Sequence, residues 1–215
     1  MTFIQTLSTY SALLPIIIGS FAIRRSRHYL FFWFFLLYGF LTDNISMSYQ
    51  LSGESRIIYD VAVANQNLYA CVDAVFLCLF IGLVYPEKGV MKWFYTMAVL
   101  LLFGWLFFYL IVKESWFENR TMSAFYDTAY HMVLSILASL ALIKMTSTHS
   151  VSPRADMWLL IGVFFYNFCV FVVMALLDTI IIVDLWFWNS LFNVITMCFY
   201  ALGYYVAVSN KESTL

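Results

Sequence analysis

Long runs of apolar residues occupy most of the chain, and short polar breaks separate them. Most runs contain about 20 residues or more, the length at which an α-helix crosses a hydrocarbon core ~30 Å thick. We therefore predict an all-α integral membrane protein, a bundle of seven transmembrane helices formed by residues 1–215 as one domain. The predicted helices are residues 3–23, 29–49, 61–85, 93–112, 122–144, 155–177 and 185–208.

The last polar break decides the helix count. Asp178 and Asp184 enclose five apolar residues, a run too short to cross a membrane, which we interpret as a tight hairpin outside it. Joining the two flanking runs instead would create one membrane segment of roughly 50 residues, about twice what a bilayer accommodates. The pattern favours seven helices over six.

The positions of lysine and arginine predict the orientation. If the basic break at 24–28 is cytoplasmic, eight basic residues lie inside and three lie outside. Short cytoplasmic loops are enriched in lysine and arginine, so we expect the N-terminus outside and the C-terminus in the cytoplasm. The inner residues are Arg24, Arg25, Arg27, Lys88, Lys92, Lys144, Arg154 and Lys211, and the outer ones are Arg56, Lys113 and Arg120.

Composition agrees with a membrane location and limits the function. Of 215 residues, 64% are hydrophobic and only 11% are charged, whereas a soluble domain carries about a quarter charged residues. The expected surroundings are therefore a lipid bilayer, and a net charge of −1 gives no indication of nucleic-acid binding. The loops are too short for a catalytic domain, so a signal would have to pass to a partner protein in the membrane or cytoplasm.

Several polar side chains fall inside the predicted helices, where ionisable groups are unfavourable by a few kcal/mol and need a partner or a function. Asp73 lies about 12 residues into its helix, near the middle of the bilayer. Asp127 and His131 share one helix face because they are four residues apart, as do Asn189 and Asn193.

With the predicted orientation, nearly all of these groups lie in the outer half of the bundle. We expect one polar pocket that is open to the outside, with Asp73 as its floor and Asp127 and His131 on its wall. Hydrogen bonds that merely join helices are the alternative explanation. The candidate ligand-binding residues are Asp73, Asp127, His131, Asn189, Asn193, Asn167, Asp43 and Asn67.

The motifs argue against most cofactors, and we predict none. The last helix has no lysine before Lys211, so a covalently bound retinal is not expected. Only one of three histidines, His131, lies in a predicted helix, which excludes a three-histidine zinc site. A zinc site formed by Asp73, Asp127 and His131 stays open.

Three stretches carry a family resemblance. They are Leu-Pro-Ile-Ile-Ile-Gly at 14–19 before a basic turn, Asn-Leu-Tyr at 67–69 with Asp73 four residues on, and Trp-Phe-Trp-Asn-Ser at 186–190 opening a helix that closes on Tyr-Tyr at 204–205. Together they resemble small seven-helix inner-membrane proteins of Bacteroidota, in which a glutamate is expected where Asp73 stands. The resemblance implies a multi-pass protein of a bacterial inner membrane and no particular reaction.

The leading hypothesis is a non-enzymatic, sensor-like or accessory protein that binds a small ligand or cation in an outward-facing pocket. A proton- or cation-coupled secondary transporter that uses Asp73 is the first alternative. The second is an intramembrane hydrolase that uses Asp73, Asp127 and His131.

Overall fold

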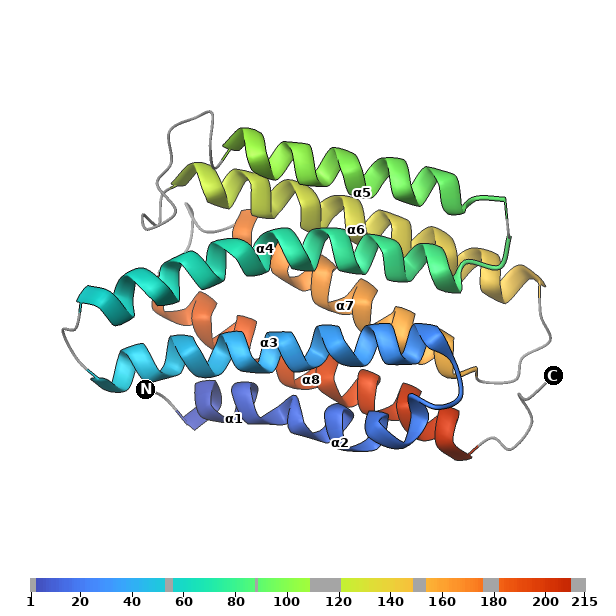
Figure 1. Cartoon of the computed structure of the whole chain (residues 1–215), viewed down its shortest axis with the longest axis horizontal. Coiled ribbons are helices and arrows are strands. Elements are labelled where there is room, and N and C mark those ends of the chain that lie inside the picture. The colour runs from blue at the N-terminus through green and yellow to red at the C-terminus, as the bar shows by residue number, and fades with distance from the viewer. Residues whose placement is uncertain are drawn as a thin grey trace.

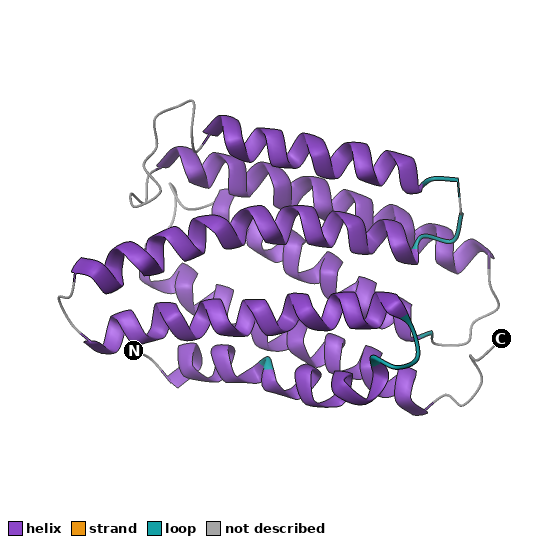
Figure 2. Ribbon diagram, in the orientation of Figure 1, coloured by secondary structure: helices purple, strands orange, loops and turns teal. Residues whose placement is uncertain are grey.

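Helices form almost all of the part of the chain that the computed structural model describes (Figures 1 and 2). The described residues are 3–52, 56–87, 89–108, 121–148, 154–175 and 182–209. Within them lie α1 (Phe3–Ser11), α2 (Leu13–Ala22), α3 (Arg27–Ser52), α4 (Arg56–Val84), α5 (Met91–Leu106), α6 (Thr121–Thr148), α7 (Ala155–Ala175) and α8 (Ile182–Ser209). The prediction of an all-α protein is confirmed.

Six helical segments in these ranges are long and apolar enough to cross a membrane. They are Phe3–Ala22, Arg27–Met47, Asp60–Val84, Phe125–Ser147, Ala155–Ala175 and Phe187–Ser209. The remaining apolar helix, α5, is shorter, and residues 109–112 of its predicted range lie outside the described residues. The chain is therefore a polytopic, membrane-protein-like helical bundle.

The first predicted helix is divided into α1 and α2 by a turn at Ala12. Pro15 has no N–H to donate, so the Ser11 carbonyl loses the partner that it would have in a continuous helix. The regular pattern resumes where the Ile16 amide donates to the Ala12 carbonyl at 3.2 Å. Proline thus bends the first span without ending it.

Both α3 and α4 are longer than hydropathy predicts. The membrane-spanning part of α3 ends at Met47, yet the helix continues to Ser52. The membrane-spanning part of α4 begins at Asp60, yet the helix starts at Arg56. The backbone hydrogen bonds continue beyond the lipid-covered part of each helix. Polar residues are tolerated in these extensions because they lie outside the lipid. Likewise α8 begins at Ile182, inside the predicted hairpin, whereas Asp178 lies outside the described residues.

The chain passes back and forth along the bundle, and consecutive long helices run in opposite directions (Figure 1). The centre is α4, which contacts α3, α5, α6 and α7. On the other side α8 packs against α1, α2 and α7. This arrangement places α1, α3 and α8 together at one side of the bundle.

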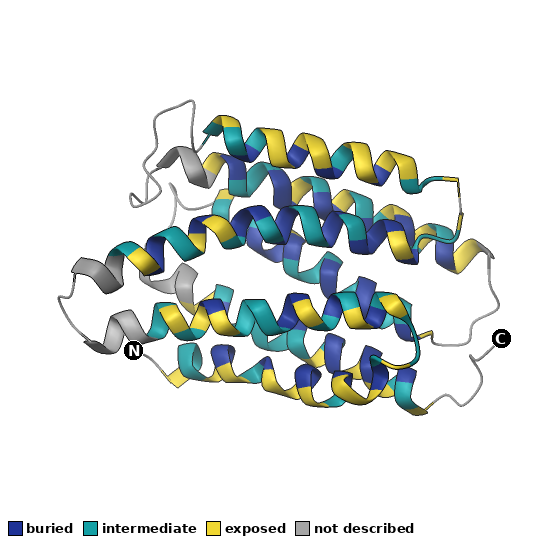
Figure 3. Ribbon diagram, viewed as in Figure 1, coloured by how far each residue is buried: buried dark blue, intermediate teal, exposed yellow. Residues whose placement is uncertain are grey.

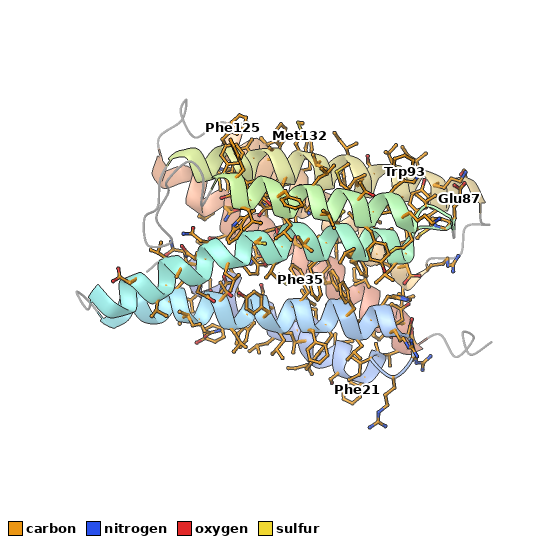
Figure 4. The ribbon with its side chains drawn as sticks, turned by 45° about the horizontal axis from the view of Figure 1, so that its top comes forward. Phe21, Phe35, Glu87, Trp93, Phe125 and Met132 are labelled. Carbon is orange, nitrogen blue, oxygen red and sulfur yellow. The ribbon has the colours of Figure 1, made fainter. Side chains whose placement is uncertain are left out.

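Exposed residues lie along the outer helices of the bundle (Figure 3), and many of them are large apolar side chains, like those of the core. Phe21 and Phe125 are 68% and 64% exposed and lie at the periphery, whereas Phe35 lies within (Figure 4). Water would not favour such a surface, since large exposed apolar areas indicate contact with another apolar phase. The exterior therefore fits a lipid bilayer.

Candidate functional site

A cavity of about 230 Å³ lies between α1, α3 and α8. It is near the end of the bundle at which α1 and α8 begin and α3 ends, which we call the cavity end. Tyr69 of α4 and Tyr166 of α7 complete its wall. The other lining residues are Gln5, Ser8, Thr9, Ala12, Phe35, Leu36, Gly39, Phe40, Asp43, Ser46, Met47, Asn189, Ser190, Asn193, Thr196, Met197 and Tyr200.

The lining carries one formal charge, the carboxylate of Asp43, and none of the described lining residues is basic. Asp43 is exposed, so its carboxylate reaches the open part of the cavity. Hydroxyl, amide and phenol groups supply the remaining polar surface, and the rings of Phe35 and Phe40 supply apolar surface. The cavity is thus acidic, rich in hydrogen-bonding groups and partly aromatic.

The wall that α8 contributes contains two polar groups without a protein partner. The Oδ1 atom of Asn189 and the Oγ1 atom of Thr196 are both buried and accept or donate no hydrogen bond. Between them, the Asn193 amide donates to the Ser8 hydroxyl of α1 at 2.9 Å. Buried polar groups are nearly always paired, so unpaired ones that line a cavity indicate a place for water or a ligand.

Three phenol side chains, those of Tyr69, Tyr166 and Tyr200, form the inner part of the wall. Tyr200 packs directly on Gly162 of α7, where a Cβ atom would lie only 2.5 Å from the ring carbon Cε1. The absent side chain at Gly162 is therefore what lets α7 and α8 approach closely and places Tyr200 at the cavity.

A second polar cluster lies in the centre of the bundle and does not line the cavity. Asp73 is fully buried, and its Oδ2 atom accepts a hydrogen bond of 3.1 Å from the Tyr130 hydroxyl of α6. Its Oδ1 atom has no partner. Asp127, one turn before His131 on α6, is near enough to interact with Asp73 electrostatically.

His131 belongs to this central cluster and bonds to α7. Its Nδ1 atom lies 2.8 Å from Oδ1 of Asn167, whose amide nitrogen donates to the Val163 carbonyl at 2.8 Å. Because that second bond fixes the amide orientation, Nδ1 of His131 is the donor to Asn167. The His131 ring also lies 4.1 Å from the Tyr130 ring and 5.7 Å from the Tyr166 ring, centre to centre.

The eight residues predicted from the sequence therefore separate into different places. Asp43, Asn189 and Asn193 line the cavity. Asp73, Asp127, His131 and Asn167 belong to the central cluster and are not among the residues that line this cavity, so the pocket expected with Asp73 as floor and Asp127 and His131 as wall is not brought together here. Asn67 is buried, and its backbone carbonyl accepts a hydrogen bond of 3.0 Å from the Trp105 indole of α5.

The reason for this division is helix packing. The polar face of α6 meets α4 and α7, whereas the polar face of α8 meets α1. Sequence spacing shows which residues share a face but not which helix lies opposite. Gln5, Ser8 and Thr9 also line the cavity and were not predicted. Their spacing of three and four residues indicates a shared polar face on the first helix.

Metal-ligand geometry gives the hydrolase hypothesis no support. Across the described ranges, no group of three or more His, Cys, Asp or Glu side chains is placed to hold a metal ion. His131 bonds to Asn167 and does not join Asp73 and Asp127 in a ligand set.

The opposite end of the bundle holds a separate polar link. Nε2 of His28 lies 2.9 Å from the Asp156 carboxylate at the start of α7, and the Ser26 hydroxyl lies 2.6 Å from Nδ1 of His28. Nearby, the Arg25 guanidinium donates to the Val208 carbonyl of α8 at 2.8 Å. The first turn of α3 is therefore joined to α7, and the turn before α3 is joined to α8.

Comparisons with protein-family models, with curated proteins and with solved structures find no match to this chain.

Proposed function

We propose that the chain is a non-enzymatic, sensor-like or accessory protein of the bacterial inner membrane that binds a small cationic ligand in the cavity between α1, α3 and α8. One observation carries the proposal: Asp43 is the only charged residue among the described lining residues. A cation entering this cavity meets a carboxylate and no competing positive charge. An anion would meet only repulsion from Asp43.

The uncharged part of the lining favours an organic cation. The rings of Phe40 and Tyr69 line the cavity, and cation–π contact contributes about 0.5–2 kcal/mol for each well-placed ring. The side-chain carbonyl of Asn189 and the Thr196 hydroxyl have no protein partner and are free to form hydrogen bonds with a ligand. An ammonium group attached to a short chain with a hydroxyl combines both kinds of contact.

Matched probes test this proposal. We expect choline to raise the unfolding temperature of the purified protein in detergent, and its neutral carbon analogue 3,3-dimethylbutan-1-ol to have little effect. A ligand that binds only the folded state stabilises it by about 2.7 kcal/mol at 100 times its Kd. Tetramethylammonium and neopentyl alcohol, a neutral compound of similar size, extend the comparison to a smaller head group.

The control variant is Asp43→Asn, which keeps the shape of the side chain and removes its charge. It should abolish the preference for the ammonium compounds while leaving the unfolding temperature of the ligand-free protein almost unchanged. Equal stabilisation by charged and neutral analogues, an unchanged preference in Asp43→Asn, or no effect of either ammonium compound would refute a cationic ligand.

The proposal includes seven crossings, with the N-terminus outside. The alternating course of the chain supports counting α5 as a crossing, because α4 and α6 run in the same direction on either side of it (Figure 1). Arg24, Arg25 and Arg27 lie at the end opposite the cavity. With these residues in the cytoplasm, the cavity faces outward, and any signal leaves through short loops to a partner protein.

The transporter alternative draws support from a different residue. Asp73 is fully buried and has an oxygen atom without a partner, a feature of proton- and cation-carrying carboxylates in membrane proteins. Uptake that depends on a pH gradient and is lost in Asp73→Asn would establish this alternative. Uptake that survives the substitution would exclude Asp73 as the coupling residue.

A further inference from the structure

Among the residues that the structure describes, no positively charged group interacts with Asp73. Its carboxylate has no ion pair with any described residue, and its one hydrogen bond comes from a neutral phenol. Charged and titratable groups of the described residues interact with it from four helices, and none is basic. They are Tyr69 of α4, Asp127 and Tyr130 of α6, Tyr166 of α7 and Tyr200 of α8.

On α3, Asp43 interacts with Tyr69 and Tyr166. An ionised Asp73 would be a buried charge beside the Asp127 carboxylate, stabilised by a single hydrogen bond. Such a charge is unfavourable by several kcal/mol, and a carboxyl group in this position binds a proton instead. The neutral acid is the form that this environment stabilises.

The two oxygen atoms of Asp73 then have different roles. Oδ2 accepts a hydrogen bond of 3.1 Å from the Tyr130 hydroxyl and is the carbonyl oxygen of the acid. Oδ1 has no partner and is the oxygen that carries the added proton. The unpaired atom thus marks where the proton binds.

Two phenols connect this position to the cavity. Tyr69 and Tyr166 line the cavity. Tyr69 lies one helical turn before Asp73 on the same face of α4, and the Tyr166 ring lies 5.7 Å from the ring of His131 in the central cluster. A phenol both donates and accepts a hydrogen bond. Oδ1 of Asp73 has no protein partner, so a water molecule completes the route. The phenol oxygen accepts a proton from water in the cavity, the phenol's own proton passes through the second water to Oδ1, and the phenol is neutral before and after the transfer.

We infer that Asp73 is an internal proton-binding site, occupied at neutral pH, whose proton exchanges with the cavity through Tyr69 and Tyr166. Proton binding follows from the burial and missing partner of Asp73 alone. The exchange route rests on the proposed function, because it ends in the cavity that receives the cation.

Infrared spectroscopy of the full chain in detergent or lipid tests proton binding. A protonated carboxyl group gives a C=O stretching band separate from the bands of carboxylates and of the backbone, and the band shifts in D₂O. We expect such a band at neutral pH in the wild type, its loss in Asp73→Asn and its retention in Asp43→Asn. Asp73→Glu, which keeps the acid, should move the band and serves as the second variant if Asp73→Asn fails to fold.

If the wild type has no band that is lost in Asp73→Asn and moved in Asp73→Glu, the inference is overturned.

The route is tested by the rate at which the band shifts after transfer to D₂O. Replacing Tyr69 and Tyr166 together by Phe should slow that rate by about tenfold or more, equivalent to about 1.4 kcal/mol of barrier. An unchanged rate would overturn the route and leave the proton site. Failure of the cavity proposal is distinguishable, since choline binding would then be absent while the band of Asp73 persists.

Discussion

The side-chain amide of Asn193 in α8 donates a 2.9 Å hydrogen bond to the hydroxyl of Ser8 in α1, which joins residues 185 positions apart. This bond closes one wall of the cavity, with Asn189 and Thr196 on either side of it along α8. The first and last helices are therefore partners in the site. Because α1 contacts mainly α8, the N-terminal segment depends on this interface for its position.

Replacing Ser8 by Ala should lower the free energy of unfolding by about 0.5–1.5 kcal/mol, since Asn193 loses its acceptor. Ser20→Ala is the matched control, because the Ser20 hydroxyl is exposed and bonds only to a carbonyl of its own helix. Chemical unfolding in mixed micelles measures both. Equal losses in the two variants would mean that the bond between α1 and α8 contributes nothing specific.

Replacing Gly162 by Ala should displace Tyr200 from the cavity wall, because the new methyl group would overlap its ring. We expect a loss of about 1–3 kcal/mol of stability from overpacking, together with weaker choline binding. Gly89→Ala is the control, since nothing lies within 4 Å of a Cβ atom there. Thermal unfolding with and without choline checks both effects, and a fully stable, fully binding Gly162→Ala protein would contradict the packing described.

A double-mutant cycle tests the bond between His131 and Asn167. His131→Phe and Asn167→Leu should each destabilise the bundle, and the pair together should cost less than the sum. We expect a coupling energy of about 0.6–1.7 kcal/mol, the range for hydrogen bonds between membrane helices. Additive effects would show that the two side chains do not stabilise each other, and would remove the basis for assigning the proton to Nδ1.

The pair of His28 and Asp156 should matter more than the surface pair of Lys144 and Glu87. The first pair is 22% and 17% exposed and the second is 38% and 50% exposed. Asp156→Ala should therefore lower the free energy of unfolding by about 1.5–3 kcal/mol, and Glu87→Gln by less than about 1 kcal/mol. Unfolding midpoints rank the two. A larger loss in Glu87→Gln would reverse the assignment of the main link at this end.

Hydropathy predicts most of the fold because a helix in lipid must satisfy its backbone internally, so that each long apolar run becomes a helix. It does not predict the extension of α3 to Ser52 or the start of α4 at Arg56. Hydropathy marks the lipid-covered part of a helix, and the helix itself continues into water. The division at Ala12 follows from Pro15, but its position depends on local hydrogen bonds.

The site is predictable only in part, for a related reason. The spacing of Asn189 and Asn193 identifies the polar face of α8, and both residues line the cavity. The same argument identifies the face of Asp127 and His131 on α6, but this face meets Asn167 and the surroundings of Asp73 instead. Periodicity contains no information about which helix lies opposite, and tyrosines such as Tyr69 and Tyr166 are also common at membrane interfaces.

The most direct test of the account is whether cations reach the cavity from outside. In a Cys198→Ser background, Met197→Cys places a thiol on the cavity wall, whereas native Cys198 is exposed on the surface of α8 and serves as the lipid-facing control. Measured on intact cells, a positively charged methanethiosulfonate reagent should modify Met197→Cys at least several-fold faster than a negatively charged one. Adding Asp43→Asn should remove the difference, and Cys198 should react with neither reagent. Equal rates, or no reaction at Met197→Cys, would contradict an outward-facing cation site.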